Sequence, residues 1–387
     1  MLASNFIHIQ NHFLLEEVEK LEALDFVSKD QWNEIKQTTK DTKTNSTILV
    51  RIGFFLLGNF LISSVLGFFA LFINAFDHQN TFAFWFLLAA IGSVMVSEFI
   101  YKKNYFAYGF DDSFILSISL FLCISLGIFT ESVLVVLFVF VLISGFCTLR
   151  YVHVPSAFFT LVGLIGLTGY LVTQEKILPS YYLPVLIFLV AIGLYFFQLK
   201  LSKKISNFIY TNVFLTIKIF SLVIGYAALN YYVVRELSAV LLGLQLLPNE
   251  EIPLAALFYF ATFALPLFYI FYGLKNRDRS FFWIGLLTLA LGFATIRYYY
   301  SFLLIEYALL LAGSLLFVVV YLSIKKIRDN TIGINFSEDK NLNPMAFEAV
   351  NHLLVNANVN NAIPSTNESP MTFGGGEYSG GGAGGSF

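Results

Sequence analysis

Lys218 is the residue whose position most favours a functional role. It lies near the middle of a long apolar segment, 207–230, and an ammonium group at the centre of a membrane costs about 2.5–3.5 kcal/mol. The helix face that carries Lys218 has small and polar residues at alternating spacings of four and three, and such faces pack against other helices rather than lipid. Its members are Asn207, Thr211, Phe214, Lys218, Ser221, Gly225 and Ala228. We therefore expect Lys218 to point into a helical bundle.

Glu306 and Arg297 are the other two charged candidates inside or beside apolar segments. Glu306 is the carboxylate that the later apolar segments offer to Lys218. At ~1.5 Å of rise per residue, however, the two differ in depth. Arg297 is the nearer partner for Glu306. Two interpretations follow: a structural Arg297–Glu306 ion pair, or a water-filled cavity lined by Lys218 and Glu306.

Other ionisable pairs favour surface positions. Glu98 and Lys102 are four residues apart, a spacing typical of an ion pair on a helix surface. His8 and His12 have the same spacing, but no further ligand completes a zinc site. We expect these histidines to lie on a solvated face.

No sequence motif predicts catalysis. Cys147 and His153 flank a short loop without the partner that nucleophilic catalysis needs. Motifs for zinc proteases, serine hydrolases and phosphate-binding loops are absent from the sequence. The sequence therefore predicts a protein that is not an enzyme and that has no catalytic, metal-binding or cofactor-binding residues.

The elements that must position these residues are apolar helices. The 387 residues are 57% hydrophobic, 18% aromatic and only 12% charged, with 44 Phe and 21 Tyr. A helix needs ~20 mostly apolar residues to cross a bilayer. Ten segments meet or approach that length: 52–74, 82–101, 113–129, 132–149, 157–172, 181–197, 207–230, 254–274, 281–296 and 302–324. The sequence predicts an all-α, polytopic transmembrane bundle of about ten spans that contacts the lipid bilayer.

The basic residues that flank these spans predict the orientation of the bundle. Lys and Arg are enriched in cytoplasmic loops. One side carries sixteen: Lys36, Lys40, Lys43, Arg51, Lys102, Lys103, Arg150, Lys200, Lys203, Lys204, Lys275, Arg277, Arg279, Lys325, Lys326 and Arg328. The other side carries three: Lys176, Arg235 and Arg297. We expect both termini in the cytoplasm and the spans in a bacterial inner membrane. The net charge of −2 gives no reason to expect nucleic acid as a partner.

The segment 231–247 is apolar enough to be considered an eleventh span. Arg235 and Glu236 interrupt it near its start, and Pro248 and Pro253 close it. Making it span would also reverse the charge asymmetry of the later loops. We interpret 231–253 as an external interfacial segment.

Residues 1–50 predict a short pair of cytosolic helices. Leu14, Val18 and Leu21 recur at helical spacing, and Ser28 with Gln31 has the form of a capping box. In the second helix, Trp32 and Ile35 would then face the first helix. The stretch 21–35, LEALDFVSKDQWNEI, resembles the N-terminal helical pair of a bacterial family of predicted multi-spanning membrane proteins of unknown function. The pair rests on the membrane surface or, alternatively, binds a partner.

The chain changes character after residue 328. Residues 329–372 are polar and rich in Asn, and residues 373–387 contain eight Gly in a segment too poor in apolar groups to fold alone. We expect a disordered tail. It resembles the Gly-rich tail of bacterial membrane-anchored proteins that carry the domain first described in thylakoid and phosphatase proteins. That domain is absent, so the resemblance implies only a shared cytoplasmic partner.

Two functions remain open for the membrane domain, residues 51–328. The first is a non-catalytic membrane scaffold or assembly protein whose N-terminal helices or Gly-rich tail bind a cytoplasmic partner. The second is a small-solute secondary transporter with a site at Lys218. Ten spans with both ends inside would fit two inverted halves of five spans, as in some exporters, although the halves show no sequence repeat.

Overall fold

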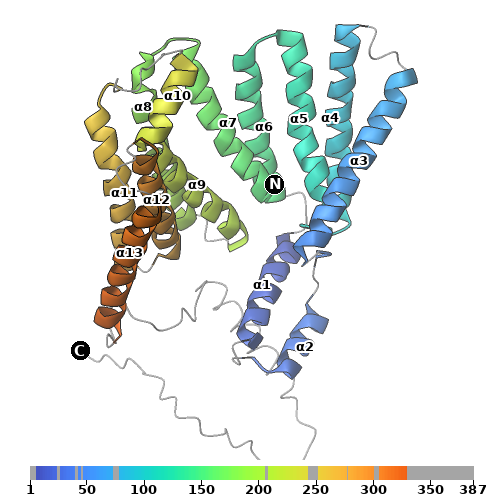
Figure 1. Ribbon diagram of the computed structural model, residues 1–387. Helices are drawn as coiled ribbons and strands as arrows, with labels where there is room; N and C mark the ends of the chain where they lie inside the picture. Colours follow the sequence, from blue (N-terminus) through green and yellow to red (C-terminus); the bar gives the residue numbers. More distant parts are fainter. Residues whose placement is uncertain are drawn as a thin grey trace, which may run out of the picture.

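The chain folds into helices throughout the part that the structure describes. The computed structural model describes residues 6–23, 27–39, 42–44, 47–72, 78–204, 208–242, 252–276, 278–299 and 305–328 (Figure 1). The α-helices are α1 (Phe6–Ala23), α2 (Lys29–Thr38), α3 (Ile48–Phe72), α4 (Gln79–Lys102), α5 (Phe110–Thr130), α6 (Val133–Tyr151), α7 (Val154–Thr173), α8 (Leu183–Lys204), α9 (Thr211–Leu229), α10 (Tyr231–Leu242), α11 (Ala255–Asn276), α12 (Arg279–Tyr299) and α13 (Ile305–Ile327). Two short 3₁₀ turns, η1 (Ser180–Tyr182) and η2 (Phe208–Tyr210), precede α8 and α9. The all-α prediction is confirmed.

Nine of the described helices, α3 to α9, α11 and α12, are long and apolar enough to cross a membrane. They match the first nine predicted spans. The tenth prediction, 302–324, falls on α13, a helix of 23 residues, with its first three residues outside the described part. Every α13 side chain that the structure describes is exposed. The chain is therefore a multi-pass membrane protein whose outer helix faces are free to contact lipid.

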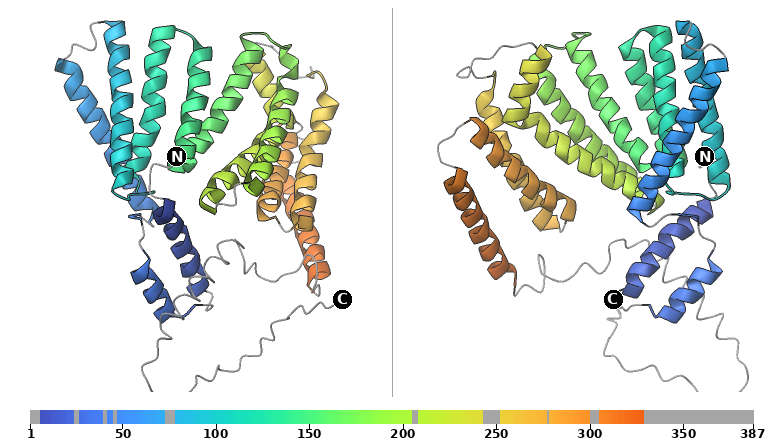
Figure 2. Two further views of the ribbon diagram at one scale, coloured as in Figure 1. Left: turned by 180° about the vertical axis from the view of Figure 1, so that it is seen from behind. Right: turned by 45° about the vertical axis from the view of Figure 1, so that its right-hand side comes forward.

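The spans form two groups (Figures 1 and 2). In the first group α5 packs against α3, α4 and α6, and α6 packs against α7. In the second group α9 packs against α8, α10, α11 and α12. The two groups meet where α7 packs against α8 and α9. We call the end of the bundle that carries α1 and α2 the N-terminal end, and the opposite end the far end.

The N-terminal helices form the predicted pair. Ser28 caps α2, since its side chain accepts from the backbone of Gln31 while the Gln31 side chain accepts from the backbone of Ser28. The two helices share a small core made of Leu14, Leu15, Val18, Leu21, Val27 and Ile35, with Trp32 packed against it. The predicted capping box and the facing of the two helices are confirmed.

The first half of α1 packs against the bundle itself. Ile9 is 1% exposed and belongs to one hydrophobic cluster with Tyr151 of α6 and Ile209 of η2. Phe13 packs against the same cluster and against Phe106 in the turn between α4 and α5. The prediction that the pair rests on a membrane surface is therefore wrong for this half of α1, which contacts both helical groups.

The described part of the segment 231–247 is shorter than a span. It contains α10, whose 12 residues are fewer than the ~20 that cross a bilayer, and the interfacial position of 231–253 stays a prediction. The helix lies at the far end, between the end of α9 and the start of α11 (Figure 1). Residues 243–251 lie outside the described part.

Candidate functional site

Lys218 forms an ion pair with Asp278, not with Glu306. Its ammonium contacts Asp278 Oδ2, and it lies 5.7 Å from the centre of the Phe281 ring. Asp278 sits in the turn between α11 and α12, at the N-terminal end. The predicted pairing with Glu306 is wrong. Lys218 is the eighth of the 19 residues of α9, near the middle of that helix as predicted, and its long side chain reaches Asp278 at the N-terminal end.

Asp278 uses its two oxygens for two tasks. Its Oδ1 accepts hydrogen bonds from the backbone N–H groups of Ser280 (3.1 Å) and Phe281 (3.4 Å), which caps the start of α12. Its Oδ2 binds Lys218. Both side chains are largely buried, at 17% and 23% exposed. The arrangement is that of a structural ion pair that fixes α9 to the α11–α12 turn.

Glu306 and Arg297 lie apart from this pair. Glu306 is exposed in the first turn of α13, and Arg297 is in the last turn of α12. Residues 300–304, which connect the two helices, lie outside the described part. The Arg297–Glu306 ion pair stays a prediction.

Glu98 pairs with a different helix from the one predicted. Its Oε1 accepts hydrogen bonds from Arg150 Nε at 2.5 Å and from the Tyr151 hydroxyl at 2.9 Å. Glu98 belongs to α4, and both donors belong to α6. The expected surface pair with Lys102 is thus replaced by a contact that joins two spans.

The sequence reasoning missed a buried cluster that contains Arg51, Asp112 and His153. Arg51 donates to Asp112 through Nε (2.8 Å to Oδ2) and Nη2 (3.0 Å to Oδ1). His153 Nε2 lies 3.0 Å from Asp112 Oδ1. The side chain of Asp112 is 10% exposed and that of His153 is 3% exposed. The cluster joins α3, α5 and the α6–α7 turn, and it gives His153 a carboxylate partner that the sequence did not indicate.

Local backbone geometry places each member of this cluster. Gly109 has a φ of 102°, a conformation that L side chains rarely adopt, and a Cβ there would collide with the carbonyl oxygen of Arg51. This close approach brings the Arg51 side chain to the start of α5. Asp111 Oδ1 accepts from the backbone N–H of Tyr108 (3.0 Å) and of Gly109 (2.9 Å), which holds the turn.

The hydrogen bond that His153 Nδ1 accepts determines the tautomer of the ring. Nδ1 lies 3.2 Å from the backbone N–H of Ser156, which donates to it and caps α7. Nδ1 must therefore carry a lone pair in the neutral ring, so the proton is on Nε2 and points to Asp112. Asp112 thus accepts from a guanidinium and an imidazole at once.

A cavity of about 150 Å³ opens beside this cluster. Its charged and polar lining comes from Arg51, Asp112, His153, His12 and Asn212 among others. These residues belong to α3, α5, the α6–α7 turn, α1 and α9, so the cavity lies between the two helical groups and under α1. The full lining is His12, Phe13, Glu16, Arg51, Tyr101, Phe106, Ala107, Asp112, Val152, His153, Val154, Ile209 and Asn212.

The two N-terminal histidines differ from the expected solvated pair. His12 is 9% exposed, and its Nε2 lies 3.4 Å from Glu16 Oε1 on the next turn of α1. The ring of His12 packs edge-on against Phe106. No group of three metal-ligating side chains occurs among the described residues.

Chemically, the cavity offers a planar guanidinium, carboxylates and imidazoles within a small, half-apolar space. An arginine fork held by one carboxylate can exchange it for a carboxylate or phosphate of similar geometry. The adjacent acids Asp111 and Asp112 at the start of α5 were the available sequence signal, but the partners of Asp112 are 41 and 61 residues away. The chain matches no protein-family model, no curated protein and no solved structure.

Proposed function

We propose that this protein is a small-solute transporter and that its solute-binding site is the cavity lined by Arg51, Asp112 and His153. The observation that carries the proposal is the position of that cavity. Buried ionisable side chains in membrane proteins commonly mark solute or ion pathways. Here they lie in the first turns of α3 and α5 and in the α6–α7 turn, at the junction of the two helical groups, where relative movement of the groups would change access.

Ion pairs and hydrogen bonds within each helical group support movement of that group as a rigid body. The Arg51–Asp112–His153 cluster and the Glu98–Arg150 pair hold the first group together. In the second group, Lys218 binds Asp278, and Asn230, which directly follows α9, donates to Thr295 of α12 at 3.1 Å. Rigid-body rocking of one helical group against the other is a common transport motion.

The solute has to be small and polar. A cavity of about 150 Å³ is below the usual size of sites for drug-sized ligands. The Arg51 fork suits a carboxylate on the solute, while Asp112 and Glu16 suit an amine. A site at Lys218 is not part of this proposal, because Lys218 already binds a carboxylate outside the cavity.

We further propose that the N-terminal end of the bundle faces the cytoplasm of a bacterial cell. The asymmetry of basic residues supports this orientation. The cavity would then exchange solute with the cytoplasm when α1 is displaced. The scaffold function stays a prediction. Its Gly-rich tail lies outside the described part, and no large hydrophobic side chain is exposed on the described residues of α1 and α2.

Cysteine protection tests the proposed site. Asn212 is exposed on the cavity wall, so Asn212→Cys in a background with Cys123→Ala and Cys147→Ala reports access. We expect millimolar solutes of one class, from a panel of amino acids, carboxylic acids and amines, to slow maleimide labelling several-fold. The same class should enter proteoliposomes.

Two variants complete this test. Asp112→Asn should abolish protection and uptake, while Lys200→Gln, a matched loss of one charge at an exposed position, should keep both. Labelling that no panel member changes, together with absent uptake, would reject the transporter proposal.

A further inference from the structure

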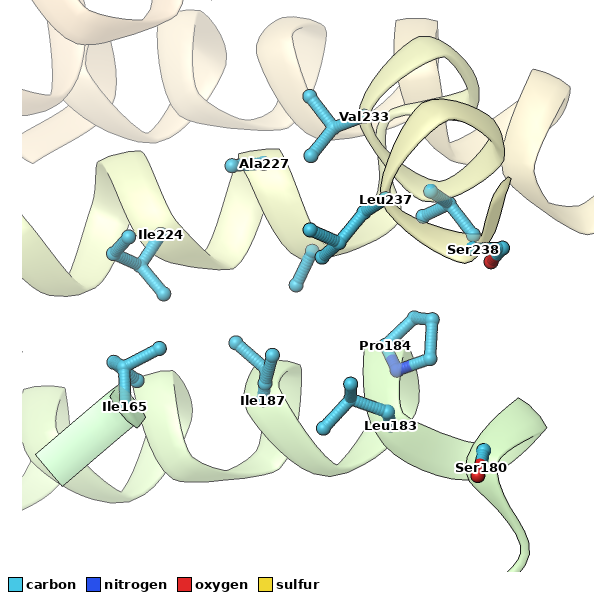
Figure 3. Close-up of a pocket in the computed structure, with 12 residues that line it drawn as sticks. Ile165, Ser180, Leu183, Pro184, Ile187, Ile224, Ala227, Val233, Leu237 and Ser238 are labelled. Carbon is cyan, nitrogen blue, oxygen red and sulfur yellow. The ribbon is translucent and has the colours of Figure 1, made fainter. Parts of the chain in front are cut away.

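A second cavity, independent of the polar one, lies at the far end of the same junction. It has a volume of about 150 Å³ and is enclosed by α7, η1, α8, α9 and α10 (Figure 3). Its walls are almost entirely aliphatic, with Ile165, Ile187 and Ile224 among them. No charged side chain is part of its lining. Such a space suits an apolar ligand.

The cavity has a polar end and an apolar end. Figure 3 shows Ile165 and Ile224 at one end and the two serines, Ser180 and Ser238, at the other. The serine hydroxyls are the polar side-chain groups of the lining. A ligand that fills this cavity therefore has an apolar body and a hydrogen-bonding end group.

Neighbouring tyrosines place the serine end at the membrane boundary. Tyr181 and Tyr182 directly follow Ser180 in η1 and are 53% and 46% exposed. Exposed tyrosines concentrate at the level of the lipid headgroups. Ser180 is then at headgroup depth, and the isoleucine end is deeper in the hydrocarbon. This is the polarity of a phospholipid, with its ester groups above its acyl chains.

The cavity is also continuous with the surface that contacts lipid. Leu237 lines it and is still 38% exposed, and Leu189, further along α8, is 56% exposed. An acyl chain can therefore enter sideways from the bilayer without crossing a polar barrier.

We propose that this cavity binds one acyl chain of a membrane phospholipid, with the ester groups of the lipid beside Ser180 and Ser238. Ile165 belongs to α7 of the first helical group, whereas Ile187 and Ile224 belong to α8 and α9 of the second. The bound chain therefore joins the two groups at the far end. This proposal does not depend on the transport proposal.

Retention of lipid after detergent extraction tests the site. The probe is dioleoyl phosphatidylglycerol added to delipidated protein and counted by native mass spectrometry. Ala227→Phe places a large ring in the cavity that Ala227 lines, and we expect it to weaken binding of the tightest lipid at least tenfold. Ala294→Phe, the same change at an exposed position of α12, should leave that binding unchanged. Equal retention by the two variants would overturn the proposal.

A second measurement uses the unaltered protein, so it does not depend on how a variant folds. A phospholipid with a diazirine near the end of its acyl chain should label peptides around Ile165 and Ile224 on illumination. Labelling there should saturate near one lipid per protein, whereas labelling at the exposed Leu189 should keep rising with lipid concentration. Cavity labelling that rises in the same way as at Leu189 would mean that only bulk lipid contacts these residues.

Discussion

Lys218 and Asp278 illustrate how single charges are accommodated in this bundle. Three ion pairs join different elements: Lys218 with Asp278, Glu98 with Arg150, and Asp112 with Arg51. The buried Asp111 instead accepts from backbone N–H groups. Desolvation makes an isolated buried charge costly, and removing one partner leaves the other uncompensated. Each pair therefore stabilises the bundle mainly because neither of its charges is left buried without a partner.

Breaking the Lys218 pair should destabilise the protein, and removing both charges should restore it. Lys218→Met leaves Asp278 without its cation, and we expect the free energy of unfolding to fall by roughly 3 kcal/mol. Lys218→Met with Asp278→Asn should recover most of that loss, because Asn also caps a helix. Thermal unfolding in detergent measures both. A double variant no more stable than Lys218→Met alone would contradict a structural pair.

Two tyrosines at the N-terminal end should differ in their contribution to stability. Tyr151 donates to the Glu98 carboxylate at 2.9 Å, whereas Tyr101 donates to the neutral carbonyl of Tyr151 at 3.2 Å. We expect Tyr151→Phe to cost about 1.5–3 kcal/mol and Tyr101→Phe about 0.5–1.5 kcal/mol. Equilibrium unfolding of the two variants in mild denaturant compares these costs, and the reverse order would show that the charge on Glu98 is not decisive.

The limits of prediction from sequence are clearest for the contacts of single charged residues. The stripe that carries Lys218 does pack inward, since Phe214, Ser221 and Gly225 are buried. Its ion-pair partner was not predictable, because Asp278 is 60 residues away and only tertiary packing of α9 against α12 brings the two together. The contacts of Arg51 and His153 with Asp112 were not predicted for the same reason. The three residues are far apart in the sequence, and only the fold brings them together.

At the scale of elements, glycine decides how closely α11 and α12 approach. A Cβ on Gly285 would lie 2.9 Å from the backbone nitrogen of Ile270, and a Cβ on Gly292 would lie 3.1 Å from the carbonyl oxygen of Thr262. Both glycines share a buried face with Thr288 and Thr295, and small residues on one helix face allow such close packing.

Alanine at Gly285 should separate the two helices. The added methyl group meets backbone, which cannot move aside, so we expect a cost of about 1–3 kcal/mol from overpacking. Alanine at Gly193, where an added Cβ would meet nothing within 4 Å, should be neutral or slightly stabilising. Melting temperatures of the two variants provide the comparison, and equal values would contradict the close approach.

The capping box of α2 gives a local prediction. Ser28→Ala removes the side-chain acceptor for Gln31 N–H at 3.3 Å, and we expect a loss of about 1 kcal/mol. The loss should appear as faster amide exchange within α2, with α1 protected as before. Uniformly faster exchange in both helices would show that the cap supports the whole pair.

At the scale of the whole molecule, hydrophobic length was enough to predict most of the architecture. Nine apolar segments became nine helices because a helix is the usual way for a lone segment to satisfy its backbone in lipid. Arg235 and Glu236 interrupt the apolar run that contains α10, and the interfacial position of this helix stays a prediction. The grouping of spans into two packed sets was not predictable, since it depends on which faces meet. Nor was the packing of α1 against the N-terminal end of the bundle.

The orientation of the bundle can be measured with two single cysteines. Asn33 is exposed on α2 at the N-terminal end, and Lys176 is exposed after α7 at the far end. In a background without native cysteines, we expect a membrane-impermeant maleimide on intact cells to label Lys176→Cys and spare Asn33→Cys. In lysed cells the same maleimide should label both variants. Labelling of Asn33→Cys in intact cells would reverse the proposed orientation.

The contact of α1 with η2 has a consequence for the order of assembly. Ile9 leaves the ribosome long before Ile209, yet the two belong to one cluster. At a synthesis rate of roughly 5–20 residues per second, α1 waits on the order of 10–40 s for the part of its binding surface that η2 supplies. During that interval Ile9 and Phe13 can contact Phe106 and Tyr151, but the cluster is incomplete. Complete burial of α1 therefore requires that the chain has been synthesised as far as η2.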